Sequence, residues 1–348
     1  MAKKKLSAAQ ELANEINATL ELDEGVRLGS DPYFTITRIP TGSLVVDRIT
    51  GGGFALGRHY ELYGDESVGK SYIVYRTMAL SQQRGNLCAI VDPEHSFDSE
   101  RFQFLGGAPG DLLAFHPVTG EDAVAVMMLL AKHAQARDIE VISCDSVASL
   151  VSRKEHAKDP RDEDELATQA RMMSKALRRI TAVNRKTLFL WTNQEYQNVG
   201  VTFGNPRATR GGRAMRYYAT GRLEFRRGQR VMEKQKVVKL SKRVETERQV
   251  GRWVQVRSEK EKSTIPFGEG AFIFNFQMKM IDPASEIIHL GLVDELIERS
   301  ANGIFTYIDL DEKEWSGNER KFSGFLRANG ELYDELLAAI QDVTRGGE

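Results

Sequence analysis

An eight-residue motif constrains this chain more than any other feature. Residues 64–71 read Gly-Asp-Glu-Ser-Val-Gly-Lys-Ser and match G-x-x-x-x-G-K-[ST], directly after the strand-like run 58–63. The glycines allow backbone angles that a side chain would forbid, so consecutive N–H groups can surround a phosphate at the positive end of the next helix. In such a loop Lys70 reaches the β- and γ-phosphates, and the Ser71 hydroxyl can bind Mg²⁺. A glycine-rich turn without a ligand is the alternative. The motif predicts a nucleoside triphosphate site made by Gly64, Asp65, Glu66, Ser67, Val68, Gly69, Lys70, Ser71 and Tyr72.

Composition places the chain among ordinary soluble proteins. Its 348 residues are 41% hydrophobic and 28% charged. No apolar run approaches the roughly 20 residues that a membrane-spanning helix needs, and residues 1–5 do not lead into a signal peptide. Cys88 and Cys144 both lie in apolar, strand-like runs. We therefore expect buried free thiols in a reducing cytosol, and neither a disulfide nor a redox or metal role.

The net charge of −1 hides an uneven distribution. Residues 207–262 contain eighteen Lys and Arg against six Glu and no Asp, a net charge of +12, so the rest of the chain carries −13. A basic surface on a nearly neutral protein suits a polyanionic partner that contacts one face. A solvated, charged hairpin would give the same count, and charge alone leaves both interpretations open.

Strands and helices alternate from residue 41 to about residue 227. This pattern predicts an α/β fold with right-handed crossovers and a mostly parallel, buried sheet. Strand-like runs lie at 58–63, 87–91, 141–144, 187–191 and 222–225, and helical patterns lie at 71–83, 121–136 and 166–183. Residues 231–256 alternate as β-hairpins do.

Both ends of the chain have patterns of their own. Residues 6–20 form an amphipathic stripe, followed by a polar linker, and a lone helix of this kind often docks on another subunit. Near the C-terminus, helical runs at 286–290, 292–299 and 332–343 surround a short strand at 305–309. We predict three parts: an N-terminal helix and linker over 1–35, which would serve subunit association, a core with the nucleotide site over 36–282, and a small C-terminal domain over 283–348.

Two strand-like runs downstream of the loop end in acids. Residues 141–144 are followed by Asp145, and residues 87–91 are followed by Asp92-Pro93-Glu94. In a phosphate-loop sheet, an acid such as Asp145 holds the Mg²⁺ shell opposite Ser71. Hydrolysis also needs a group that orients and deprotonates water, and Glu94 has that chemistry at a neighbouring strand end. The alternatives are a helix cap for Asp145 and a turn acid for Glu94.

Together with other segments, these motifs resemble the RecA family of homologous-recombination ATPases, and the preferred subtype is a bacteriophage-type RecA-like recombinase. The matching segments follow the family's order over essentially the whole chain: 41–43, 61–71, 91–95, 144–150, 171–174, 193–194, 203–206 and 211–212, with 289–294, Trp315 and 328–330 near the C-terminus. The resemblance implies an α/β fold: a RecA-like phosphate-loop ATPase core with a mostly parallel central sheet, an N-terminal helix and a small α+β C-terminal domain.

The resemblance also implies roles around the nucleotide. Glu94 becomes the catalytic carboxylate, and Gln194 senses the γ-phosphate at the start of the second DNA-binding loop. Asp98 is placed to contact the adenine. In the family an aromatic residue often stacks on that adenine, and this chain has Arg101 at the corresponding position. A guanidinium can also stack on a base. Residues 257–267 resemble a segment of the family in which two lysines reach the γ-phosphate of the neighbouring subunit. Those lysines would be Lys260 and Lys262, although alternating Lys and Glu is also common on an exposed strand.

DNA contacts are expected from two loops and the helix between them. In the second loop, about 195–209, the apolar side chains would act as wedges between stacked bases. Gly211 and Gly212 would let backbone N–H groups approach a phosphate. The first loop, about 155–165, is acidic. The predicted DNA-binding residues are Leu166, Arg171, Ser174, Arg178, Val199, Val201, Phe203, Arg207, Arg210, Gly211, Gly212 and Arg213.

The resemblance implies an ATP- and Mg²⁺-dependent recombinase. It would polymerise as a helical filament on single-stranded DNA, pair it with homologous double-stranded DNA and exchange strands, in the bacterial cytosol, including that of a phage-infected cell. Single-strand-binding or loader proteins are expected partners, and no membrane is. Two alternatives remain: a hexameric helicase-type motor on the same fold, and an ATP-regulated assembly protein without strand exchange.

Overall fold

The computed structural model describes residues 7–20, 25–158, 166–197, 207–239 and 242–346. They belong to two compact units, residues 1–37 and residues 38–348. In the first unit, α1 (Ala8–Thr19) begins after Ser7, whose hydroxyl accepts the N–H of Gln10. The expected amphipathic helix is present. Its apolar stripe is exposed to solvent, since the side chains of Leu12 and Leu20 are 56% and 49% exposed. A short turn of 3₁₀ helix, Pro32–Phe34, follows.

The second unit is built on a large, mostly parallel sheet, as predicted. Its strands run in the order β12-β11-β10-β9-β3-β7-β6-β4-β5, and those from β9 to β5 are parallel. The strands are β3 (His59–Gly64), β4 (Leu87–Val91), β5 (Leu112–Phe115), β6 (Ile139–Cys144), β7 (Leu188–Gln197), β9 (Gly221–Lys239), β10 (Lys242–Glu261), β11 (Glu269–Asn275) and β12 (Met280–Ile281), with β8 (Arg207–Thr209) beside β7. The helices of this part are α2 (Leu44–Ile49), α3 (Lys70–Gln83), α4 (Ser99–Phe104), α5 (Gly120–Arg137), α6 (Arg153–His156), α7 (Leu166–Val183) and α8 (Arg213–Tyr218).

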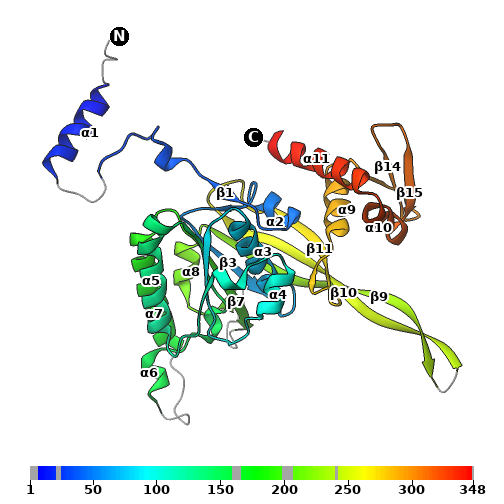
Figure 1. The fold of residues 1–348 in the computed structure, drawn as a ribbon, viewed down its shortest axis with the longest axis horizontal. Helices are drawn as coiled ribbons and strands as arrows, with labels where there is room; N and C mark the ends of the chain where they lie inside the picture. The colour runs from blue at the N-terminus through cyan, green and yellow to red at the C-terminus, as the bar shows by residue number, and fades with distance from the viewer. Residues whose placement is uncertain (1–6, 21–24, 159–165, 198–206, 240–241, 347–348) are drawn as a thin grey trace. The chain divides into compact units, whose positions relative to one another are not determined.

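Side chains that alternate along the buried strands divide the core into two layers. Cys88 and Ile90 of β4 face the cluster that contains α3, whereas Ala89 and Val91 face the cluster that contains α5, α7 and α8. Because successive residues of a strand point to opposite faces, an unbroken apolar run is what a sheet covered on both sides requires. The helices flank the sheet accordingly (Figure 1). Both cysteines are buried and free, as expected.

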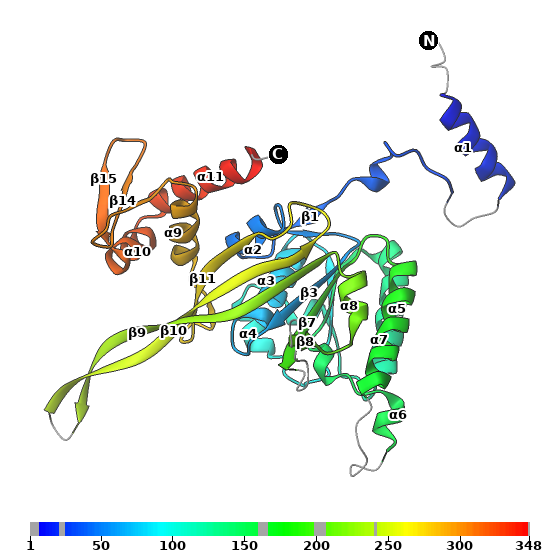
Figure 2. The ribbon, with the colours of Figure 1, turned by 180° about the vertical axis from the view of Figure 1, so that it is seen from behind.

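Beyond the sheet, β9 and β10 continue as one long two-stranded ribbon (Figure 2). β9 and β10 pair with each other from Gly221 and Glu261 to Lys239 and Lys242. Within this hairpin, β9 also pairs with β3 over Gly221–Phe225, and β10 also pairs with β11 over Gly251–Arg257. In this ribbon Lys234 lies opposite Glu247 and Glu233 lies opposite Arg248, which stabilises an exposed pair of strands. The predicted hairpins are thus one hairpin, which carries much of the basic segment.

The C-terminal elements share the core of the same unit. They are α9 (Pro283–Val293), β13 (Glu298–Arg299), β14 (Ile304–Ile308), β15 (Glu314–Asn318), α10 (Glu319–Ala328) and α11 (Gly330–Gly346). Phe322 and Leu336 belong to the cluster that includes Phe272 of the sheet. The prediction of a helix over 292–299 is wrong. α9 ends at Val293 because Glu295 adopts a left-handed φ of 59°, and the chain then turns into β13.

Candidate nucleotide site and nucleic-acid surface

Four parallel strands end at one edge of the sheet and bring the predicted site residues together. In the register of the sheet, Gly64 of β3 lies beside Gln194 of β7, while Val91 of β4 lies beside Cys144 of β6. The phosphate loop, Glu94, Asp145 and Gln194 therefore follow adjacent strands at the same carboxyl edge. In open α/β sheets this edge is where ligands bind.

The phosphate loop has the backbone that its glycines predict. Gly64 has a φ of 122°, and a Cβ there would lie 2.1 Å from the carbonyl oxygen of Phe225. Gly69 has a φ of 92° and ends the loop directly before α3. The Lys70 ammonium donates to the carbonyl oxygens of Gly64 and Asp65, at 3.1 and 2.5 Å. Burial lowers the pKa of Lys70, against the opposing effect of nearby carboxylates, chiefly Asp145. A partly buried cation is thus held against the carbonyl oxygens of the loop, which suits a polyphosphate.

Asp145 follows β6 and is 6% exposed. Its carboxylate accepts hydrogen bonds from the hydroxyls of Thr192 and Ser71. Burial raises the pKa of Asp145, these two hydroxyls lower it, and the carboxylates of Glu94 and Asp92 raise it further. A carboxylate and a hydroxyl at hydrogen-bonding distance are the hard oxygen ligands that Mg²⁺ prefers. The residues present therefore fit the predicted metal.

Glu94 is held from the turn after Asp145. Its Oε1 accepts hydrogen bonds from the hydroxyls of Ser146 and Ser149, at 2.5 and 2.8 Å. The turn that carries Glu94 is anchored by Asp92, whose buried carboxylate accepts the N–H of Phe97 at 2.8 Å. Neither serine was assigned a role from the sequence, although both lie in the segment 144–150. Their hydroxyls orient the carboxylate at the sheet edge.

A cavity of about 270 Å³ extends from the phosphate loop to aromatic and cationic residues. Tyr72, a predicted contact, lines it and packs edge-on against Phe274. Arg101 also lines the cavity, whereas Asp98 caps α4 by accepting the Arg101 N–H at 2.9 Å and is not among the lining residues. Sequence reasoning missed three lining residues, Phe274, Phe276 and Lys279. The alternating aromatic residues of β11 were the available signal.

On the other side of the loop, Gln194 lines a polar hollow of about 330 Å³. Arg226 and Arg227 line it too, and the Arg227 guanidinium donates to the carbonyl oxygen of Glu66 through Nε at 3.0 Å and Nη2 at 2.9 Å. These arginines belong to the basic segment but were not singled out. Gln194 thus shares this hollow with the start of the phosphate loop and with two cations.

A buried network runs from the strand of Gln194 to the strand of the two lysines. The Asn193 amide donates to Glu61 Oε1 at 2.8 Å, and Arg222 Nε donates to Glu61 Oε2 at 2.6 Å. Arg222 also pairs with Glu259 at 2.7 Å, beside Lys260. Each charge in this network has an opposite charge as its partner, which offsets part of the free energy lost when charges are removed from water. The network thereby connects β7, β3, β9 and β10.

The two lysines lie away from the phosphate loop of their own chain. Lys260 and Lys262 donate to the carbonyl oxygen of Tyr217, at 3.3 and 3.4 Å, and Lys260 also donates to that of Arg216, at the end of α8. Burial, the neighbouring Lys262 charge and Arg222 lower the pKa of Lys260 to about 8. The structure therefore brings Glu94, Asp145 and Gln194 to the loop but not these lysines.

The predicted DNA residues of α7 share one exposed face. Arg171, Ser174 and Arg178 are all exposed, at helical spacings of three and four. Gly211 and Gly212 lie against the same helix, since a Cβ on Gly212 would lie 2.8 Å from Cβ of Ala170. Arg213 is exposed at the start of α8, and the Arg210 guanidinium lies 5.1 Å from the Tyr196 ring centroid.

Other predicted DNA contacts fall outside what the structure describes. Val199, Val201, Phe203 and most of the acidic first loop (159–165) lie outside the described residues. Leu166 begins α7 and Arg207 begins β8, but their side chains also lie outside the described part. What is described of the second loop is its base, where Glu195 pairs with Thr209 and Gln197 pairs with Arg207 in antiparallel register.

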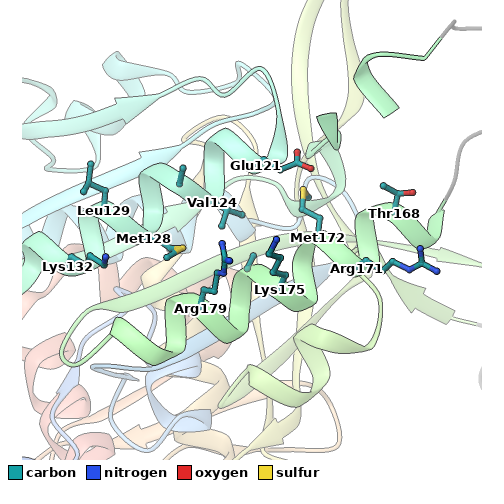
Figure 3. A pocket seen from close by; sticks show the side chains of 12 residues that line it. Glu121, Val124, Met128, Leu129, Lys132, Thr168, Arg171, Met172, Lys175 and Arg179 are labelled. Carbon is teal, nitrogen blue, oxygen red and sulfur yellow. The ribbon is translucent and has the colours of Figure 1, made fainter. Parts of the chain in front are cut away.

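A groove of about 580 Å³ lies between α5 and α7 (Figure 3). Apolar side chains, including Val124, Met128 and Met172, line it, and Lys132, Arg171, Lys175 and Arg179 add cations. Figure 3 shows Met172, Lys175 and Arg179 of α7 directed toward α5, whereas Leu129 of α5 is directed away from α7. Arg171, a predicted DNA contact, thus also lines this groove.

Comparison with known proteins gives a consistent result. A family model described as the RecA N-terminal domain matches residues 7–277. The chain is 37% identical to a Protein RecA of Thermus thermophilus over 327 residues, which are 93% of this chain and 89% of that protein. It is 35% identical to Protein RecA of Thermus aquaticus (90% and 88% covered) and 33% identical to that of Salinispora arenicola (90% and 85% covered). None of the helices in the described ranges is long and apolar enough to cross a membrane.

Proposed function

The chain belongs to the RecA family, and from that premise we propose that it is an ATP-dependent DNA recombinase. It forms a helical filament on single-stranded DNA and couples DNA-stimulated ATP hydrolysis to homologous pairing and strand exchange. One observation carries the proposal: the phosphate loop, Asp145, Glu94 and Gln194 meet at one edge of the sheet. The base of the Glu195–Thr209 loop continues from that edge.

The loop binds the triphosphate of ATP through its inward N–H groups and the Lys70 ammonium. Lys70 now donates to two loop carbonyls, and phosphate oxygens would replace these acceptors. Ser71 and Asp145 would hold Mg²⁺, which, when bound, neutralises phosphate charge. Because the site is partly buried, these charge-assisted contacts are stronger than they would be in open water.

Glu94 is the residue that accepts a proton from the attacking water. Its Oε1 is held by the hydroxyls of Ser146 and Ser149, which leaves Oε2 to accept the proton. Holding one oxygen fixes the plane of the carboxylate, so less reorganisation is needed at the moment of reaction. The two serines are therefore positioning residues for Glu94.

Gln194 and the two lysines make the site responsive to DNA and to a neighbouring subunit. Gln194 lies beside Gly64 in the sheet and directly precedes the second DNA-binding loop. Lys260 and Lys262 would reach the γ-phosphate of the adjacent subunit, so that ATP joins two subunits. Loss of the γ-phosphate on hydrolysis would then loosen both the interface and the DNA loop.

The nucleic-acid surface would consist of the exposed face of α7, the Gly211–Gly212 turn and the second loop. Single-stranded DNA would lie against these elements, and homologous duplex DNA would be the second substrate. Single-strand-binding or loader proteins would act with the filament in the bacterial cytosol. Family membership favours this recombinase over a closed-ring motor or an assembly protein without strand exchange.

Electron microscopy with single-stranded DNA and a slowly hydrolysed ATP analogue tests the proposal. We expect helical filaments, together with ATP-dependent strand exchange between a circular single strand and a homologous linear duplex. Lys70→Ala serves as the control, because deleting the cation that faces the phosphates should abolish both. Closed rings, or filaments that never exchange strands, would contradict the proposed function.

A further inference from the structure

One arginine of β9 contacts the phosphate loop from the side of the polar hollow. Nε and Nη2 of Arg227 both donate to the carbonyl oxygen of Glu66, at 3.0 and 2.9 Å. Arg227 and Glu66 line the hollow of about 330 Å³, whereas Ser67, the next residue of the loop, lines the nucleotide cavity of about 270 Å³. The loop therefore passes from one cavity to the other at the peptide bond between Glu66 and Ser67.

The direction of the Glu66 carbonyl sets the direction of the N–H group that follows it. The Glu66–Ser67 peptide bond is trans, and in a trans peptide the C=O and N–H groups lie in one plane and point in opposite directions. Because Arg227 holds the carbonyl on the side of the hollow, the Ser67 N–H is directed to the side of the nucleotide cavity. N–H groups on that side are what a phosphate loop offers to its ligand.

The backbone of Ser67 requires support from outside the cavity. Its φ is 57°, a left-handed conformation that costs free energy in a residue with a Cβ. Lys70 holds the carbonyl oxygens of Gly64 and Asp65, but phosphate oxygens would compete for that ammonium. The guanidinium of Arg227 does not line the nucleotide cavity, so a bound triphosphate would leave its contact with Glu66 in place.

A second contact fixes the backbone of Arg227 against the loop. The Asp65 carboxylate accepts the N–H of Arg227 at 2.8 Å, and the N–H of Asp65 donates to the carbonyl oxygen of Phe225 at 3.0 Å. These two hydrogen bonds follow directly after the pair that Gly64 of β3 forms with Phe225 of β9. They extend the pairing of the two strands into the loop, so the Arg227 side chain starts from a fixed position.

We propose that Arg227 is a positioning residue of the nucleotide site, which holds the Ser67 N–H toward the polyphosphate through the Glu66 carbonyl. The inference rests on the proposed function, since it concerns the same site. Glu94 and the two serines that hold it follow β4 and β6, and none of them contacts Arg227. Arg227 therefore contributes to the binding of ATP and leaves the hydrolytic step unchanged. This role does not depend on DNA, although Arg227 belongs to the basic segment.

Nucleotide binding without DNA tests this role, because a contact between Arg227 and DNA cannot then contribute. We would measure the dissociation constant of ATP with Mg²⁺ for full-length Arg227→Ala, by competition with a fluorescent nucleotide. We expect a loss of affinity of about fivefold or more, which is less than a buried charged hydrogen bond would give, since Arg227 is exposed. An unchanged affinity would overturn the inference and leave the proposed function standing. A wild-type protein that bound no ATP would contradict both.

Arg230→Ala is the matched control. It removes another exposed arginine from the same strand, and Arg230 lines neither the hollow nor the nucleotide cavity. We expect it to change the affinity for ATP by less than about twofold. If Arg230→Ala weakened ATP binding as much as Arg227→Ala, loss of positive charge alone would explain both results, and the positioning role would be refuted.

Steady-state kinetics at saturating DNA separate binding from chemistry. In Arg227→Ala the KM for ATP should rise about fivefold or more, while kcat should stay within about twofold of the wild-type value. A loss of overall stability would not produce this division between KM and kcat in the folded protein. A lower kcat at unchanged KM would contradict the inference, because it would place Arg227 in the hydrolytic step.

Substitutions of Asp65 test the second contact by the sign of their effect. Loss of the negative charge alone should tighten the binding of a polyphosphate, whereas loss of the hydrogen bond to the Arg227 N–H should weaken it. Asp65→Asn removes the charge but keeps an acceptor oxygen, and Asp65→Ala removes both. We therefore expect Asp65→Ala to bind ATP about threefold or more weakly than Asp65→Asn, the effect of one neutral hydrogen bond. Equal affinities of the two variants would show that this bond does not position the loop and would contradict the proposal.

Discussion

Replacing Lys260 and Lys262 together by alanine separates a site shared between subunits from a site within one subunit. In the sheet, Lys260 pairs with Arg222 of β9, which pairs with Glu61 of β3. Glu61 precedes Gly64, where the phosphate loop begins, by three residues of the strand. The lysines therefore lie two strands away from the loop and toward the opposite end of β3.

The distance follows from the geometry of a sheet. Three residues along a strand span about 10 Å, and two strand spacings add about 10 Å at a right angle, so the backbone at Lys260 lies about 14 Å from that at Gly64. The loop holds the phosphates beyond Gly64, which lengthens the gap further. The Lys260 ammonium is moreover bound at the end of α8. Neither lysine can contact the phosphates of its own chain in this conformation.

The two arrangements differ in the ATP affinity of the free subunit. If the lysines acted within one chain, each lost charge-assisted contact would be worth roughly 1.5–3 kcal/mol, or about a tenfold to hundredfold loss of affinity. If they act across an interface, the affinity of the dilute monomer should change by less than about twofold. ATP-dependent filaments, DNA-stimulated hydrolysis and strand exchange should all be lost together.

Mixing two defective proteins decides between these outcomes. Subunits with Glu94→Gln and subunits with the double lysine change should each fail to hydrolyse ATP with DNA. In mixed filaments, some interfaces combine an intact Glu94 with the intact lysines of a neighbour, and part of the hydrolysis should return. A mixture that demonstrably co-assembles but restores no hydrolysis would refute the shared site, as would a tenfold loss of monomer affinity in the double variant.

Three of the predicted site residues lie at or just after the carboxyl ends of buried strands. Glu94, Asp145 and Gln194 each come after an apolar run, and parallel strands bring their carboxyl ends to one edge. Their convergence could therefore be predicted from order and periodicity. The bounds of α7 were also predictable, because its apolar stripe is regular and the chain on both sides is polar.

The residues that the sequence did not identify come from places where pattern carries no spatial information. Phe274, Phe276 and Lys279 reach the nucleotide cavity because β11 returns to the same sheet as β3, far along the chain. Ser146 and Ser149 depend on the conformation of one turn. The strand β5 was missed because it is an edge strand of only four residues, and an apolar run this short does not by itself distinguish a strand from other structure.

Two further substitutions test the catalytic carboxylate and a buried acid of α9. Glu94→Gln keeps the hydrogen bonds that hold Oε1 but cannot accept the water's proton, so ATP and DNA binding should persist while hydrolysis falls to near zero; near-normal DNA-stimulated turnover would remove Glu94 from the mechanism. Glu286 accepts the Ser43 hydroxyl at 2.5 Å, and burial, with the Asp47 charge as a lesser cause, raises its pKa from 4.5 to about 7. Between these two pH values the folded protein keeps a proton that the unfolded chain has released, so the free energy of unfolding should fall as pH rises from about 4.5 to 7, by at most about 3 kcal/mol. Glu286→Gln does not titrate and should flatten this part of the pH profile in denaturant unfolding, measured from about pH 5 to about pH 8. A variant with the same slope as the wild type would show that Glu286 is already charged in the folded protein.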